Sequence, residues 1–286
     1  MTRSPRVLVV GPASANEIIH LAALPPPQSG THFAERAWST LGGTSAGKAL
    51  NLVSLGAEVT LLTVLGADRT GARVRDSLTA AGVRVVSRPS RSGACERHVN
   101  LMTDAGERVS IYTHLPEPLE PWRRSDAEQH LSAADVVVTD LSDHARSWVG
   151  WGQEAGVPVW ADLHDYDGVS AFHADFTRAD HLQLSSVRMP DWRGWATRAA
   201  ERGASVVVTH GADGSSAVDA DGRWTDVAGE PVDVVDTNGA GDAFFAGFLV
   251  ARLAGGDLTA SLEAGARQAA VCLGGPHLAG RVGELF

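Results

Sequence analysis

Short hydrophobic runs alternate with longer stretches of helical periodicity over most of the chain. The runs are hydrophobic almost throughout, as in strands buried on both faces of a sheet. They predict strands at Val7–Val10, Val59–Val64, Val83–Val86, Val136–Thr139, Val157–Ala161, His181–Leu184 and Ser205–Thr209. Helices are predicted around Ala46–Leu55, Thr70–Ala81, His144–Ala155, Trp192–Arg202, Ala240–Ala254 and Thr259–Leu273. This alternation predicts an α/β fold, with a doubly wound, mostly parallel sheet flanked by helices.

Two segments interrupt the alternation with short extended pieces joined by turns. One covers about residues 14–40, and the other covers about 94–114, where HVNLMTDAGERVSIY alternates around a DAG turn and predicts a hairpin. Such insertions can pair into one small sheet that closes over a site as a lid, or they can be two unrelated surface hairpins. With no repeat or linker elsewhere, we expect a single domain over residues 1–286 that carries these two lid insertions.

Composition narrows the classes of function. The 286 residues include 24 Lys and Arg against 34 Asp and Glu, for a net charge of −10, which argues against a nucleic-acid partner. The longest apolar run, Ala243–Ala251, is too short to span a membrane. Two cysteines cannot form a disulfide framework or a four-ligand zinc site by themselves. We therefore expect a cytoplasmic protein with neither a membrane nor a nucleic acid as partner.

The most informative segment is VVDTNGAGDAFFAGFLVARLAGG, residues 234–256. Gly239, Ala240 and Gly241 form a small-residue turn, and Asp242 opens a long apolar helix. The first amides of a helix have no partner within the helix and suit an anion such as a transferring phosphoryl group. An aspartate there can be a helix cap, but three small residues before it favour a catalytic carboxylate beside an anion hole.

The sequence DTNGAGDAFFAGF resembles the carboxyl-terminal signature of the ribokinase-like sugar kinases, the PfkB family. LGGTSAGKALNLVSLGAEVTLLTVLGADRTG, residues 41–71, resembles that family's amino-terminal signature. VVVTHGADGSSAV, residues 206–218, resembles its nucleotide-binding strand and turn. The resemblance implies a ribokinase-like fold and transfer of the γ-phosphate of ATP, with Mg²⁺, to a primary hydroxyl of a small ribose- or fructose-like sugar. A nucleoside is the alternative acceptor within this family.

The resemblance also implies roles for individual residues. Asp242 would be the base that activates the hydroxyl, while the amides of Gly239, Ala240 and Gly241 hold the phosphoryl charge. The nucleotide would lie at Thr209, Gly211 and Gly214, against a small-residue wall of Ala266, Ala269 and Ala270, although these alanines fit ordinary helix packing equally well. Asp236 stands where some members bind a monovalent cation such as K⁺, and the alternative for it is a turn cap.

For the acceptor, the resemblance points to Gly42 and Gly43, with the lid above them and, in several members, a homodimer formed through the lid. Asn16 replaces an Asp that often binds acceptor hydroxyls, and Gly47 followed by Lys48 replaces an Asn. Asp162, at a predicted strand end, is a further substrate candidate. In LQLSSVRM, Ser185 and Arg188 replace an Asn-x-x-Glu pattern that helps to organise magnesium, so Arg188 either contacts phosphate or lies on the surface.

Other interpretations of these segments remain open. GGTSAGK nearly matches a P-loop, but Ala49 follows it where the magnesium-binding hydroxyl should be. The run DLHDYD, residues 162–167, could hold a metal or form a solvated turn. A non-catalytic sugar or nucleotide sensor would keep the fold, whereas a dinucleotide-dependent oxidoreductase would need a G-x-G-x-x-G turn that the first strand lacks.

Overall fold

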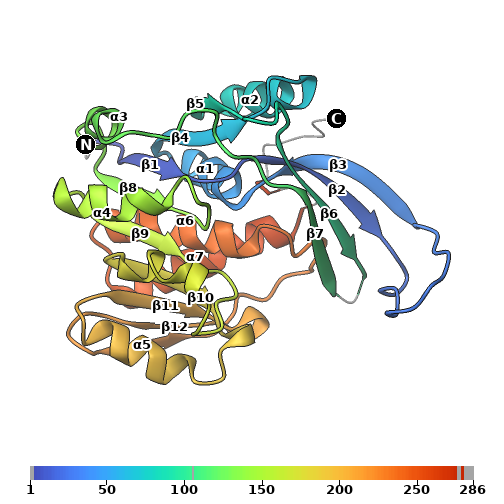
Figure 1. Cartoon of the computed structure of the whole chain (residues 1–286). Helices are drawn as coiled ribbons and strands as arrows, with labels where there is room; N and C mark the ends of the chain where they lie inside the picture. Colours follow the sequence, from blue (N-terminus) through green and yellow to red (C-terminus); the bar gives the residue numbers. More distant parts are fainter. Residues whose placement is uncertain (1–2, 105, 276–277, 280–286) are drawn as a thin grey trace.

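The computed structural model of the chain describes residues 3–104, 106–275 and 278–279. Two sheets organise it: a large one with helices on both faces, and a small one that projects from one edge (Figure 1). The predicted fold class is confirmed. None of the helices in the described ranges is long and apolar enough to cross a membrane.

The large sheet has nine strands in the order β13-β12-β11-β10-β9-β8-β1-β4-β5. Its seven strands from β11 to β5 pair in parallel, and β12 and β13 add an antiparallel edge. The bounds are β1 Arg6–Val10, β4 Glu58–Leu65, β5 Arg84–Pro89, β8 Val136–Thr139, β9 Val159–Asp162, β10 His181–Ser185, β11 Ser205–Thr209, β12 Ser215–Val218 and β13 Trp224–Val227.

Helices cover both faces of this sheet because its strands are apolar on both. In β1, Val7 and Val9 face one core, whereas Leu8 and Val10 face the other. Four helices close the first core: α1 Thr44–Ser54, α2 Arg69–Ala80, α6 Ala240–Leu253 and α7 Leu258–Leu273. Three close the second: α3 Arg124–Leu131, α4 Arg146–Glu154 and α5 Trp192–Ala200.

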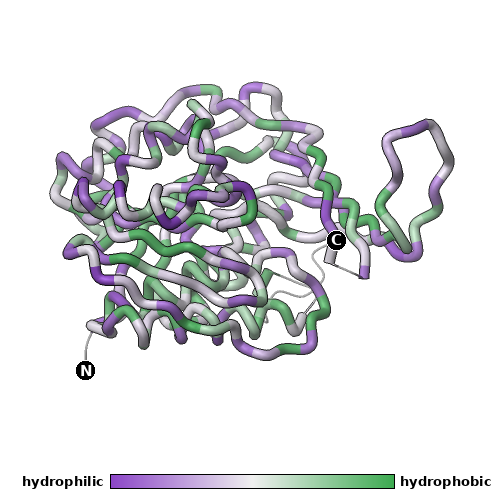
Figure 2. The backbone as a smooth tube through the Cα atoms, turned by 90° about the horizontal axis from the view of Figure 1, so that it is seen from below, coloured by the Kyte–Doolittle hydropathy of each residue, from purple (hydrophilic) through white to green (hydrophobic). Residues whose placement is uncertain are grey.

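The two insertions pair with each other, as one of the two interpretations predicted. They form a four-stranded small sheet in the order β3-β2-β6-β7, in which β2 and β6 run parallel. The 21–35 connection between β2 and β3 stands out from the body, whereas hydrophobic segments follow the strands inside it (Figure 2). Residue 105, in the predicted DAG turn, lies outside the described residues. The strands are β2 Ser14–His20, β3 Arg36–Gly42, β6 Glu96–Met102 and β7 Arg108–His114.

Strand order reverses between β1 and β8, because β1 is followed outward by β4 and β5 on one side and adjoins β8 on the other. In open α/β sheets, ligands bind beyond the carboxyl ends of the strands at such a switch point. The small sheet begins at the carboxyl ends of these strands, since β2 starts four residues after β1 ends. The topology alone therefore places a site between the switch point and the small sheet.

Candidate active site

Two buried carboxylates lie at the carboxyl ends of neighbouring parallel strands. Asp140 follows β8 directly, and Asp162 is the last residue of β9. Their side chains are 0% and 3% exposed. Burying a carboxylate is costly unless a cation and hydrogen bonds compensate, so both need partners close by.

Lys48, on α1, is their common partner. Its ammonium Nζ lies 2.9 Å from Asp140 Oδ1 and 2.9 Å from Asp162 Oδ2, and its side chain is fully buried. Ser45, one turn earlier on the helix, donates to the other oxygen of Asp140 at 2.6 Å. The ammonium therefore occupies the position between these carboxylates that a metal ion would need.

The third carboxylate near this ammonium is Asp242, whose Oδ1 lies 2.5 Å from Lys48 Nζ. Asp242 lies in the first turn of α6, which begins after Gly239 in the left-handed conformation at φ +81°. A Cβ at Gly47 would lie 2.7 Å from Asp242 Oδ2, so only glycine leaves room for the carboxylate there. Gly47 and the turn at Gly239 together bring α1 and α6 close enough for Lys48 to reach Asp242.

His164 completes this buried charge cluster of Lys48, Asp140, Asp162, His164 and Asp242. Its Nε2 lies 3.2 Å from Asp140 Oδ1, and its Nδ1 lies 3.6 Å from Asp162 Oδ2. The backbone at His164 has φ +51°, an unusual value for a residue other than glycine, and its amide donates to Asp162 Oδ1 at 2.9 Å. Burial opposes the charged imidazolium, but Asp162 and Asp140 outweigh it and raise the pKa of His164.

The pKa values of Asp242 and Asp140 are shifted in opposite directions. Burial raises the pKa of Asp242 to about 6, and nearby Asp140 adds to the rise, although Lys48 opposes both. Burial alone would also raise the pKa of Asp140. Contacts with Lys48, His164 and Ser45 outweigh the burial, so the pKa of Asp140 is lowered. Carboxyl groups whose environments separate their pKa values are typical of acid–base sites.

A pocket opens at Asp242 beneath the small sheet. We call it the proximal pocket. Asn16 projects into it from β2, where it accepts a hydrogen bond from Ser14 Oγ at 2.7 Å, and a Cβ at Gly42 would lie 2.1 Å from the Asn16 amide. The pocket is lined by Asn16, Gly42, Gly43, Thr44, His98, Asn100, Arg108, Ser110, Tyr112, Asn238, Asp242 and Leu278.

Not all of the predicted acceptor residues reach this pocket. Asn16, Gly42 and Gly43 line it, as the resemblance implied, and Asp242 lies at its floor. Lys48 and Asp162 lie behind Asp242 as buried partners of one another rather than on the pocket surface. Gly47 also lies behind the floor, where its missing side chain makes space for Asp242.

The turn before α6 presents backbone amides beside Asp242. The first hydrogen bond along the helix runs from Ala243 N to Gly239 O, so the amides of Ala240, Gly241 and Asp242 precede it. That of Ala240 reaches Thr237 O at 3.5 Å. The Gly241 carbonyl accepts from Gln183 Nε2 at 3.0 Å, which ties the turn to β10. This arrangement suits the binding of an anion at the N-terminus of α6.

The predicted nucleotide residues lie away from the proximal pocket, on the strands toward the antiparallel edge. Thr209 ends β11, and the turn to β12 runs through Gly211 and Gly214 at φ +61° and +102°. The alanines 266, 269 and 270 lie on α7, which packs against β12 and β13. Arg188 follows β10 in a short 3-10 helix (Ser186–Arg188) and pairs with Asp165 at 3.2 Å and Asp167 at 3.8 Å.

Asp236 is buried in the loop before the turn, and its Oδ1 accepts from Asn238 N at 2.7 Å. This is the turn-capping contact that the sequence suggested. Asp236 also lines a second pocket farther out beneath the small sheet.

Several site residues were not anticipated from the sequence. Asp140 has no local motif, and its only signal is its place directly after a buried parallel strand. His98, Arg108 and Tyr112 lie outside every recognised motif, on the two strands of the second insertion. Only the pairing of the two insertions brings them over Asp242.

Comparison with known proteins supports this description. Residues 194–279 match the model of the pfkB family carbohydrate kinases. The acarbose 7(IV)-phosphotransferase of Actinoplanes sp. is 31% identical over 273 residues, which cover 93% of this chain and 91% of that protein. The chain belongs to the pfkB family of carbohydrate kinases.

Two further similarities extend over most of this pfkB chain. The ATP-dependent ribose-1-phosphate kinase of Halopiger xanaduensis is 31% identical over 231 residues, 78% of this chain and 76% of that protein. Among solved structures, a microbiome-derived acarbose kinase superposes with a TM-score of 0.84 at 29% identity, covering 96% of this chain and 94% of that one. The similarity to the acarbose phosphotransferase and to the acarbose kinase structure thus covers more than nine-tenths of this chain.

Proposed function

We propose that this protein is an ATP-dependent sugar kinase that phosphorylates a primary hydroxyl, with Asp242 as the base. One observation carries the proposal: Asp242, with a pKa raised to about 6, forms the floor of the proximal pocket at the first turn of α6. A carboxylate with a pKa near the working pH is well suited to accept and release a proton. The relatives that act on sugars support the choice of acceptor class.

In the proposed reaction, the acceptor hydroxyl gives its proton to Asp242 Oδ2, because Oδ1 is held by Lys48. The hydroxyl oxygen then forms a bond to the γ-phosphorus of ATP while the bond to the β,γ-bridging oxygen breaks and ADP leaves. The amides of Gly239, Ala240 and Gly241 stabilise the charge on the transferring group, which is mainly an effect of positioning and electrostatics.

We assign to Lys48 the role of a positioning residue rather than a substrate ligand. Its ammonium fixes Asp242 Oδ1 and offsets part of the negative charge of three buried carboxylates. Without that cation, close carboxylates hold a proton and the base would be protonated at neutral pH. Asp162 and His164 help to hold this arrangement. Asp162 pairs with Lys48, and His164 contacts both Asp140 and Asp162.

For ATP we propose the wall formed by Thr209, Gly211, Gly214 and the alanines of α7, with Arg188 available to phosphate. The residues at the Asn-x-x-Glu position do not fit a protein-bound magnesium ion, because Ser185 and Arg188 offer no carboxylate there. Mg²⁺ commonly binds through substrate phosphates and water, so we expect it to enter with ATP. Asp236 offers a buried carboxylate for a monovalent cation such as K⁺.

We further propose that the chain is one functional unit in which the small sheet acts as a lid over the acceptor. Its outward face exposes Val109 and Ile111, which suits a homodimer formed through the lid. Because ATP is a cytoplasmic metabolite, we place the reaction in the cytoplasm.

A panel of acceptors tests the proposed function. Purified protein with Mg²⁺ and ATP is offered ribose, fructose, glucose, oligosaccharides and nucleosides, and ADP release is measured. We expect sugar-dependent ADP formation and a phosphomonoester at a primary carbon. Turnover with nucleosides alone would make the chain a nucleoside kinase, and binding of sugar without turnover would make it a sensor.

A further inference from the structure

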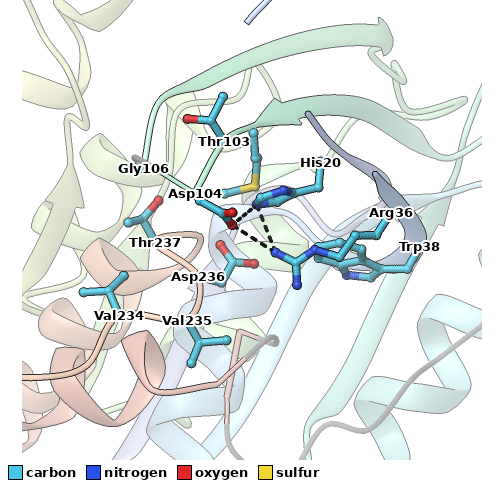
Figure 3. A pocket seen from close by; sticks show the side chains of 11 residues that line it. His20, Arg36, Trp38, Thr103, Asp104, Gly106, Val234, Val235, Asp236 and Thr237 are labelled. Atoms are coloured by element: carbon cyan, nitrogen blue, oxygen red, sulfur yellow. Dashed lines mark hydrogen bonds and ion pairs between the residues drawn. The ribbon is translucent and has the colours of Figure 1, made fainter. Parts of the chain in front are cut away.

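A second pocket lies beyond the proximal one, farther from Asp242. We call it the distal pocket (Figure 3). Its walls come from the small sheet and from residues 234–237, the loop that leads into the turn before α6. None of the roles assigned above uses this space, apart from a cation at Asp236.

The two pockets lie along one face of the small sheet. Side chains on a strand alternate between its faces, so residues of equal parity share a face. On β2, Asn16 lines the proximal pocket and His20 lines the distal one. The pattern repeats on β6, where His98 and Asn100 line the proximal pocket and Met102 the distal one.

The pockets also adjoin each other. Met102 of the distal pocket pairs across the sheet with Arg108 of the proximal one. On the opposite wall, Thr237 lines the distal pocket and the next residue, Asn238, lines the proximal pocket. Four residues along a strand span about 13 Å, so the groove from Asn16 to His20 is longer than one sugar ring needs.

The distal pocket combines flat apolar surface with both kinds of hydrogen-bonding group. Trp38 and Met102 line the pocket from the small sheet, where the Arg36 guanidinium lies 6.0 Å from the centroid of the indole, and Val234 and Val235 line it from the loop (Figure 3). The indole Nε1 of Trp38 is buried with no hydrogen-bond partner among the residues that the structure describes. A buried donor without a partner is costly, so the Trp38 side chain gains a hydrogen bond if it turns its Nε1 toward a ligand oxygen in the pocket.

Charged groups surround this apolar surface in a connected set. Arg36 Nη2 lies 3.3 Å from Asp104 Oδ1 and 3.2 Å from His20 Nε2. Asp236 projects into the same space from the opposite wall (Figure 3). The carboxylates disfavour a phosphate, and Arg36 disfavours a cation, whereas a neutral polyhydroxylated ring can use donors and acceptors at once.

We propose that the distal pocket is a second sugar-binding subsite, so that the acceptor is a glycoside or oligosaccharide rather than a free monosaccharide. One ring places its primary hydroxyl at Asp242, and a further ring joined by a glycosidic bond lies against Trp38 with its hydroxyls toward Arg36, Asp104 and Asp236. This inference rests on the proposed function and specifies its substrate class.

The test compares monosaccharides with their glycosides. Steady-state ADP release is measured with glucose, fructose and ribose, then with maltose, cellobiose, sucrose and maltotriose. We expect kcat/KM to be about tenfold or more higher for one of the longer sugars than for its component monosaccharide, through a lower KM, as one well-packed aromatic contact can provide.

Variants then assign the gain to this pocket. Trp38→Ala should remove the advantage of the longer sugar by raising its KM, with kcat/KM for the monosaccharide within about twofold of the unmodified protein. Trp38→Phe should keep most of the gain. Ser39→Ala, the next residue on β3 and on the opposite face, is the matched control and should change neither value.

The outcomes separate the subsite from the proposed function. Equal kcat/KM for monosaccharides and glycosides would overturn the subsite and leave the sugar kinase standing. A parallel loss on both substrates in Trp38→Ala would also overturn it, because a merely structural role has that effect. ADP release with none of these sugars would count against the proposed function and the subsite together.

Discussion

Lys48 and Asp140 have opposite effects on the pKa of Asp242. Lys48 stabilises the ionised carboxylate through a 2.5 Å contact, whereas the negative charge of Asp140 favours its protonated form. His164 also favours the ionised carboxylate of Asp242, whereas Asp162 favours its protonated form. The pKa of Asp242 is thus set by its burial and by charged groups on α1 and at the carboxyl ends of β8 and β9.

This opposition gives a prediction for the pH dependence of kcat/KM. The acid limb of the unmodified protein should lie at about pH 6, with activity lost as Asp242 gains a proton below it. Lys48→Met should move that limb to higher pH, and Asp140→Asn should move it to lower pH. Each variant is measured over the pH range at saturating ATP.

If the acid limb moves in the same direction in the two variants, or moves in neither, the assigned role of Lys48 is contradicted. Lys48→Met leaves buried carboxylates without their cation, which can cost about 3–5 kcal/mol of stability. Asp140→Asn removes a charge instead of isolating one, so it tests the same electrostatics even if Lys48→Met does not fold. Circular dichroism of each variant supplies the control for folding.

Lys48 can reach Asp242 because two helices lie close together. Helices α1 and α6 approach closely because Gly47 presents no side chain toward Asp242. The same contact accounts for the glycine at position 47, in the segment where the family resemblance suggested asparagine.

Gly47→Ala should therefore impair turnover more than folding. The added methyl group would lie 2.7 Å from Asp242 Oδ2, so the carboxylate must move. We expect kcat to fall by about tenfold or more, since small displacements of a base are costly to catalysis. The control is Gly150→Ala in the middle of α4, where the nearest atom to the new Cβ is 3.9 Å away. An active Gly47→Ala enzyme with unchanged kcat would refute this role for the glycine.

Elements with strong periodicity were predictable, and weakly patterned ones were not. The bounds of six of the seven parallel strands are predicted to within about two residues because both of their faces are apolar, whereas the partly exposed β5 runs three residues beyond its predicted end at Val86. Helix α3 was missed because it buries only Ala127 and Leu131 and is otherwise polar. The β13 edge was missed because it is short and only partly buried.

The site shows the same division. Asp242 could be found because a local motif surrounds it. The three carboxylates that pair with Lys48, in contrast, lie about 90, 110 and 190 positions away from it in the sequence. A contact of that kind is fixed by the strand order of the sheet, which the sequence does not display.

At the scale of the whole molecule, the exposed apolar residues of the small sheet bear on assembly. Val109 and Ile111 are 43% and 47% exposed on the face turned away from the pockets. If that face forms a dimer, light scattering should give twice the chain mass, and Ile111→Asp should give a monomer. Val169→Asp, at an exposed position outside this sheet, should leave the dimer intact. A monomeric unmodified protein would rule out this assembly.

We propose an active site between the two sheets: helix α6 supplies the base, α1 and the carboxyl ends of β8 and β9 supply the charges around it, and the small sheet covers the acceptor. The proposed phosphoryl transfer depends on Asp242 taking the proton from the acceptor hydroxyl. Its carboxylate is held at a pKa of about 6 by burial, against the pull of Lys48. The substitution Asp242→Asn keeps the shape of the residue and removes that function.

The most direct test is the rate of ADP release by Asp242→Asn at pH 7.5 with saturating ATP and the best sugar acceptor. We predict that kcat falls by about 10²–10⁴-fold, the usual contribution of a general base, while the acceptor still binds. The melting temperature should not fall, because the variant removes a buried carboxylate whose raised pKa costs stability above pH 6. An unchanged kcat in the folded variant would contradict the assignment of Asp242 as the base.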